Sequence, residues 1–109
     1  MAYDEQLAGR LRTLIAKRTD FYEQNMFGGM GFLLRGNMCF GIWKEDLILR
    51  LGPEPAVKAL KQKNVVPFDI TGRPMKGWVV VKPNGFKSDA ALKGWVDQAI
   101  AFVSQLPGK

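Results

Sequence analysis

Between Tyr22 and Leu51 the chain consists of short apolar stretches separated by glycines and charged residues. Short apolar runs bounded by turn residues are typical of β-strands rather than helices. Tight turns join such strands as hairpins, so about 30 residues are enough for three or four strands without a long connection. The pattern therefore predicts an antiparallel meander, and this constrains the fold more than any other feature of the sequence.

Two turns in this region carry recognisable signals. Gly36-Asn37 separates two apolar runs, and a glycine at the first central position is what a two-residue type II′ hairpin turn requires. Lys44-Glu45-Asp46 supplies the next polar turn. Leucine then alternates with other residues from Leu47 to Leu51, which predicts a strand that buries its leucines and turns Arg50 toward the other face of the sheet.

Amphipathic helices are expected at both ends of the chain. The first runs from Asp4, its N-cap, to about Lys17, with Lys17 and Arg18 at the negative end of the helix dipole. Ser88 can cap a second helix that extends to about Gln105. The apolar stripes that define them are Leu7, Leu11, Leu14 and Ile15 in the first helix, and Leu92, Trp95, Val96, Ala99, Ile100 and Val103 in the second.

A short third helix is predicted after Gly52-Pro53, because proline is well tolerated at the first helical position. Its predicted apolar stripe consists of Ala56, Val57 and Leu60, with Lys58, Lys61 and Lys63 on the polar face. Two more strand candidates lie between Val65 and Lys82, separated by a turn at Thr71-Gly72-Arg73-Pro74.

The order helix, strands, helix, strands, helix determines the predicted fold class. It indicates an α+β fold with two layers, in which the terminal helices pack on one face of an antiparallel sheet. The 109 residues have room for one hydrophobic core, so residues 1–109 are expected to form a single domain.

Side chains that could carry out chemistry are scarce. The absence of histidine excludes Ser-His-Asp and Cys-His catalytic pairs as well as His-ligated metals. Cys39 is the only cysteine, which permits no internal disulfide and fits a reducing compartment, and its apolar neighbours indicate a buried small hydrophobe. Among the scattered acids, only Asp69 is expected to be buried, beside Arg73 or Arg50. No catalytic residue, metal or cofactor is predicted.

The net charge of +6 is distributed unevenly. Residues 1–46 contain six basic and six acidic groups, so the whole excess lies in residues 47–109, where it would attract polyanions. No apolar run approaches the roughly 18 residues of a membrane span. The N-terminus is acidic and polar where a secretory signal would be basic and then apolar. We therefore expect a cytoplasmic protein without membrane contact.

Three groups of residues are candidate sites. A phosphate, a carboxylate or a protein partner could contact the cations and the indole of Arg50, Arg73, Lys76 and Trp78. Gly28 and Gly29 could form a backbone nest for an anion, although a sharp turn is the more common use of such glycines. The candidate contacts for nucleic-acid phosphates are Lys58, Lys61, Lys63, Lys82 and Lys87. Lysines on the wet face of a helix need no ligand, and a tryptophan beside a turn is usually a core residue.

Five spaced stretches of the chain form a recognisable order. They are Met26-Phe27-Gly28-Gly29 with Phe32, then Gly36-Asn37-Met38, Arg50-Leu51-Gly52-Pro53 and Gly72-Arg73-Pro74-Met75-Lys76-Gly77-Trp78-Val79, and finally Trp95, Ala99 and Phe102. Together they resemble the N-terminal domain family of the TfoX (Sxy) competence regulators, over almost the whole chain. The resemblance implies an α+β domain without an established catalytic site or cofactor, and in longer members a link to transcriptional control of DNA-uptake genes. Because the chain ends at Lys109, without the C-terminal domain that resembles a helix-hairpin-helix unit, a stand-alone member is expected.

These observations favour a small non-enzymatic module of regulatory type that binds a protein partner or a second copy of itself. A homodimer would form through an edge strand of the sheet. The alternative function is weak, sequence-indifferent nucleic-acid binding through the basic second half. A more distant alternative is a small-anion or enzymatic site near Arg50, Arg73 and Lys76.

Overall fold

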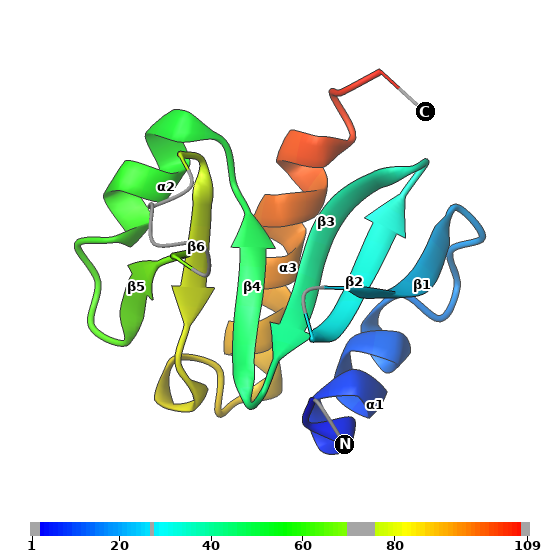
Figure 1. The fold of residues 1–109 in the computed structure, drawn as a ribbon, viewed down its shortest axis with the longest axis horizontal. Coiled ribbons are helices and arrows are strands. Elements are labelled where there is room, and N and C mark those ends of the chain that lie inside the picture. The colour runs from blue at the N-terminus through cyan, green and yellow to red at the C-terminus, as the bar shows by residue number, and fades with distance from the viewer. Residues whose placement is uncertain (1–2, 27, 70–75, 108–109) are drawn as a thin grey trace.

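The computed structural model describes residues 3–26, 28–69 and 76–107. In chain order the elements are α1 (Glu5–Leu14), β1 (Phe21–Met26), β2 (Gly29–Leu34), β3 (Asn37–Trp43), β4 (Asp46–Arg50), α2 (Pro53–Ala59), β5 (Val65–Pro67), β6 (Trp78–Val81), the 3-10 turn η1 (Pro83–Gly85) and α3 (Asp89–Val103). The strands form a six-stranded sheet in the order β1-β2-β3-β4-β6-β5 (Figure 1). All neighbouring strands are antiparallel, so the predicted meander is confirmed for β1 to β4.

One face of the sheet is covered by helices. α3 crosses behind the central strands in Figure 1 and contacts β3 and β4. The main hydrophobic core joins residues from the helices, among them Leu7, Leu11, Ala56, Ala59, Leu92, Trp95 and Val96, to residues from the strands, among them Phe32, Phe40, Leu47, Leu49 and Val79. The predicted α+β fold, with both terminal helices on the same face, is therefore confirmed.

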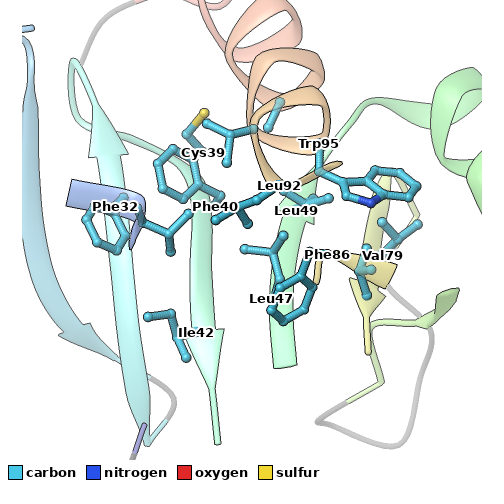
Figure 2. Packing of buried hydrophobic residues seen from close by; sticks show 14 of the residues in the cluster. Phe32, Cys39, Phe40, Ile42, Leu47, Leu49, Val79, Phe86, Leu92 and Trp95 are labelled. Atoms are coloured by element: carbon cyan, nitrogen blue, oxygen red, sulfur yellow. The ribbon is translucent and has the colours of Figure 1, made fainter. Parts of the chain in front are cut away.

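Phe32, Cys39 and Phe40 lie close together in this core (Figure 2), beside a β-bulge in the pairing of β2 with β3. The Phe32 and Phe40 rings stack with their centroids 4.9 Å apart. The pairing of β2 with β3 shifts after Phe32, and this leaves Cys39 as an extra residue on β3. Cys39 and Phe40 consequently both point into the helix-covered core. Burial raises the pKa of the Cys39 thiol to about 12, so this side chain packs as the small hydrophobe that the sequence predicts.

The other face of the sheet carries a smaller core. Ile48 and Val80 are paired across β4 and β6, and both pack with Phe68. Partly buried side chains of Met38, Trp43 and Trp78 pack against this cluster. The predicted alternation in β4 is confirmed, because its leucines belong to the helix-covered core whereas Ile48 and Arg50 face the other way.

Both predicted helix caps are present. Asp4 Oδ1 accepts two backbone N–H hydrogen bonds from the first turn of α1, at 2.9 and 3.3 Å. Ser88 Oγ accepts one from Ala91 N–H at 3.0 Å. α1 ends at Leu14 rather than near Lys17, because the following residues form tighter i→i+3 hydrogen bonds that turn the chain toward β1.

The turn between β2 and β3 lies one residue earlier than predicted and has a different type. Leu34 pairs with Asn37, so the loop residues are Arg35 and Gly36, with φ angles of 51° and 86°. Positive φ at both positions is the signature of a type I′ turn rather than type II′. Asn37 belongs to β3 instead, where its buried side chain donates from Nδ2 to the carbonyl oxygen of Pro107 at 2.8 Å.

The prediction of a buried Asp69 is wrong, because this residue is exposed. β5 ends at Pro67, so Asp69 lies beyond the paired part of the sheet. The buried acid is Asp46, only 5% exposed, whose Oδ2 accepts a hydrogen bond from Lys82 Nζ at 2.9 Å. The two residues flank the paired Leu47 and Val81, so their ion pair links β4 to the end of β6.

Candidate functional site

The middle helix packs on the sheet through its alanines. Ala56 and Ala59 are buried, whereas Val57 is 57% exposed and Leu60 is 36% exposed. The predicted burial of Val57 and Leu60 is therefore wrong. Alanine side chains are small enough to let the α2 backbone lie close to the sheet, and this orientation leaves the two larger side chains at the surface.

An open groove lies between α2 and the ends of β5 and β6, and we call it the α2 groove. It has a volume of about 240 Å³ and is lined by Pro53, Ala56, Val57, Leu60, Pro67, Lys76, Gly77 and Trp78. One end is held by the backbone, since the carbonyl oxygen of Gly77 accepts N–H hydrogen bonds from Leu51 at 2.9 Å and Gly52 at 3.1 Å. Gly52 and Gly77 have φ angles of 92° and 89°, a conformation that favours glycine. The shape of the groove therefore depends on this close backbone contact.

Among the described residues, one lysine lines the α2 groove, and two more line the hollow next to it. Val57 and Lys76 also line a second hollow of about 500 Å³ on the outer side of α2, together with Pro53, Glu54, Lys58 and Lys61. Within the described part of the chain, none of the three lysines has a carboxylate at ion-pair distance. The rim is therefore positive, with a single acidic residue in its lining.

The structure brings together part of the predicted cation–aromatic site. Arg50 and Trp78 are cross-strand partners, and Arg50 Cζ lies 5.4 Å from the centre of the Trp78 ring. It also lies 6.0 Å from the centre of the Phe102 ring of α3. Lys76 and Trp78 both line the α2 groove, so the contact between Arg50 and Trp78 lies next to the groove. Arg73, the remaining member of the predicted set, lies outside the described residues.

The glycine pair lies at the other end of the sheet. Gly28, with a φ angle of 76°, lies directly before β2, and Gly29 pairs with Met26 as the first residue of β2. This is the geometry of a tight turn, and it lies away from Arg50 and Trp78.

The five lysines predicted to contact nucleic acid lie in several places. Lys58 and Lys61 line the hollow beside α2, whereas Lys63 lines a different one next to α3. Lys82 is engaged with a buried carboxylate, and Lys87 precedes the first turn of α3. Only Lys58 and Lys61 therefore share a surface with Lys76.

Sequence reasoning missed the apolar half of this site. Hydrophobic patterning predicts a polar face for the lysines next to Val57 and Leu60 and burial for the two apolar residues, whereas the structure exposes both. A signal was nevertheless present, because Ala56 and Ala59 form an i, i+3 pair that can face the sheet by itself. In a helix of seven residues, such a pair leaves larger apolar side chains free for the surface.

The fold and the groove define a class of protein: an α+β domain with a lysine-rimmed apolar groove beside its middle helix. A family model described as the TfoX N-terminal domain matches residues 13–103, which is most of the chain. The chain therefore belongs to the TfoX N-terminal domain family. Searches of curated proteins and of solved structures gave no significant match. Arg50–Pro53 and Gly77–Val79, parts of two stretches that carry the family resemblance, meet at the α2 groove.

The described residues contain neither a membrane-spanning helix nor a cluster of metal-ligating side chains. No helix among them combines the length and apolar character needed to span a bilayer. They also contain no group of three or more cysteine, aspartate or glutamate side chains placed to hold a metal ion.

Proposed function

We propose that the protein is a small non-enzymatic module of regulatory type, and that it acts by binding a protein partner in the α2 groove. The observation that carries this proposal is the exposure of Val57 and Leu60 on an apolar groove. Apolar surface of this kind, with a polar rim, is typical of interaction sites. Membership of the TfoX N-terminal domain family supports a TfoX-like module. We favour binding over catalysis because a chain without histidine lacks the usual acid–base group near neutral pH.

Affinity purification with a groove variant tests this proposal. Tagged wild-type protein, expressed in the cells to which it is native, is expected to retain a partner after nuclease treatment. Val57→Asp should lose that partner, because a carboxylate on the groove wall would be desolvated against apolar side chains. Tyr22→Ser is the control, since Tyr22 is also an exposed large apolar residue but lies on β1. Equal recovery of the same proteins with wild type and Val57→Asp would contradict the proposal.

Weak nucleic-acid binding is the second candidate function, and the gathering of Lys58, Lys61 and Lys76 around α2 favours it. Each neutralised phosphate contributes about −0.9 to the slope of log affinity against log salt, so three contacts predict a slope of about −2.7. We expect the protein to bind labelled duplexes at low salt without preference for sequence. This binding should disappear at about 150 mM salt. Submicromolar affinity for one sequence at that salt concentration would place DNA recognition first.

Self-association through a sheet edge stays a prediction, and β1 is the edge that favours it. β5 has only three residues and ends in a proline, whereas β1 has six residues and no proline. Arg35 N–H bonds to the carbonyl oxygen of Asp20, so by antiparallel alternation Phe21, Glu23 and Asn25 point their N–H groups away from β2. A second copy could pair with these groups across a two-fold axis.

Light scattering at high micromolar concentration tests the β1 edge. Wild type is expected to exceed the 12.2 kDa of one chain, and Asn25→Pro to return to that mass, because proline removes an outward N–H without interrupting the β1–β2 ladder. Gln24→Ala, an exposed change on the same strand that keeps every N–H, is the control. A wild-type mass of 12.2 kDa would argue against pairing.

A further inference from the structure

The α2 groove suits the side chains of a protein segment better than a small molecule. It is open to solvent, with a volume of about 240 Å³, and shares Pro53, Val57 and Lys76 with the adjoining open hollow of about 500 Å³, whereas small-molecule sites bury most of their ligand. Val57 and Leu60 are three residues apart and therefore neighbours on the surface of α2, and Pro53 and Pro67 extend the apolar lining. The groove can accommodate one or two apolar side chains of a partner.

The charge around the groove restricts the chemistry of that partner. Lys58 lies on α2, Lys61 lies two residues beyond its end, and Lys76 lies just before β6. All three are exposed. Glu54 is the one acidic residue among those that line the two hollows. A partner segment with apolar side chains flanked by carboxylates would match both the apolar lining of the groove and the lysines beside it, because complementary charge guides and selects partners.

Addition of a partner strand at β5 is poorly supported. The Lys82 N–H donates a hydrogen bond to the carbonyl oxygen of Asn64 at 2.7 Å. Because backbone groups alternate in direction along a strand, the backbone polar groups of Val65 and Pro67 point toward the free edge of β5. Pro67 has no N–H, which leaves Val65 as the one outward donor of this three-residue strand. A partner therefore binds through its side chains, and a helix laid in the groove presents them at the required spacing.

A second copy of the described chain does not offer such a segment. Five acids are in ion pairs: Asp20, Glu23, Asp46, Asp89 and Asp97. Asp4 caps α1. The others are Glu5, Glu45, Glu54 and Asp69, and these are far apart in the chain. No described segment combines several free carboxylates with exposed apolar side chains, so the occupant is a different protein.

We propose that the α2 groove binds an acidic amphipathic segment of a partner protein, with two apolar residues about one helical turn apart and aspartates or glutamates beside them. This inference rests on the function proposed above, and it adds the chemical class of the partner. Val57 and Leu60 contact the apolar residues, while Lys58, Lys61 and Lys76 contact the carboxylates.

Selection from a random-peptide display library tests the inference, with wild-type protein as the target and Val57→Asp for counter-selection. The enriched peptides are expected to be acidic, with two apolar residues three or four positions apart. Synthetic copies of them should bind Lys58→Glu/Lys61→Glu at least tenfold more weakly than wild type. Lys63→Glu/Lys87→Glu is the matched control, because it has the same net charge but leaves the rim intact. Thermal melting verifies that each variant is folded. If Val57→Asp does not fold, Leu60→Asp replaces it in the counter-selection.

The possible outcomes separate this inference from the proposed function. Basic or uncharged peptides that still require Val57 would overturn the acidic partner and leave the interaction module standing. The same holds if the two charge variants bind the peptide equally, or if duplex DNA displaces the peptide at about 150 mM salt. Peptides that bind Val57→Asp as well as wild type, or no enrichment over a blank surface, would contradict both the inference and the groove as the site of the proposed function.

Discussion

Trp95→Ala is expected to lower the free energy of unfolding by about 3–5 kcal/mol, the range for deletion of a large buried aromatic side chain. Trp95 is only 8% exposed and belongs to the main core, where it lies between α3 and the strands (Figure 2). Its indole Nε1 also donates to the carbonyl oxygen of Gly85 at 3.0 Å, so the substitution removes a hydrogen bond as well as apolar contacts. Denaturant titration of wild type and variant measures the difference.

Two variants on the same helix make the result for Trp95 specific. Trp95→Phe retains most of the apolar contact and loses the hydrogen bond, so it should be destabilised by less than Trp95→Ala. Gln98→Ala changes an exposed residue and should stay within about 0.5 kcal/mol of wild type. An unchanged unfolding midpoint for Trp95→Ala would mean that α3 does not present this face to the sheet.

Gly41→Ala is expected to destabilise the protein by roughly 3 kcal/mol, at the upper end of the usual effect of overpacking. A Cβ at this position of β3 would lie 2.5 Å from the backbone oxygen of Met30 and 2.9 Å from Met38 Cε. The end of the methionine side chain can move away, but the Met30 carbonyl is part of the neighbouring strand. Relief therefore requires a shift of β2 relative to β3, and thermal or denaturant unfolding would record its effect.

Gly94→Ala is the matched control for Gly41→Ala. Gly94 lies inside α3, and a Cβ there would meet no atom within 4 Å. Because alanine has the higher helix propensity, this variant should gain about 0.5–1 kcal/mol. The same chemical change is thus expected to have opposite signs at two positions. A neutral Gly41→Ala would show that the two strands are not as close as the structure places them.

The candidate site was only partly predictable from the sequence. Arg73, Lys76 and Trp78 share one short stretch of sequence, and Arg50 is a further candidate cation from a different stretch. The structure makes Arg50 and Trp78 cross-strand partners. The sequence predicts that Lys82 shares a basic surface with Lys58, but its ion-pair partner is Asp46, 36 positions away in the chain. Pairing of that kind depends on which strands become neighbours, and local patterns contain no information about it.

Two sequence-based predictions, for the β2–β3 turn and for the buried face of α2, are wrong for a similar reason. Gly36-Asn37 is a plausible hairpin turn by composition, yet Asn37 pairs with Leu34 as the first residue of β3. Its side chain donates to the carbonyl oxygen of the distant Pro107. On α2, hydrophobicity alone favours burial of Val57 and Leu60. Alanines instead face the sheet, because the space available beside β6 decides which side chains fit.

What the sequence determined by itself was local: the helical caps at Asp4 and Ser88, the alternation of β4, the meander, and the α+β order of elements. These features depend on residues within a few positions of one another, so their physical causes are visible in the chain. The tertiary structure alone decided the placement of β6 between β4 and β5, the burial of Asp46 and the exposure of Val57 and Leu60. Each of these depends on contacts between segments far apart in the sequence, where backbone distance and side-chain volume determine which groups become buried. The α2 groove arises in this way, from a short helix whose alanines face the sheet and whose larger apolar side chains remain at the surface.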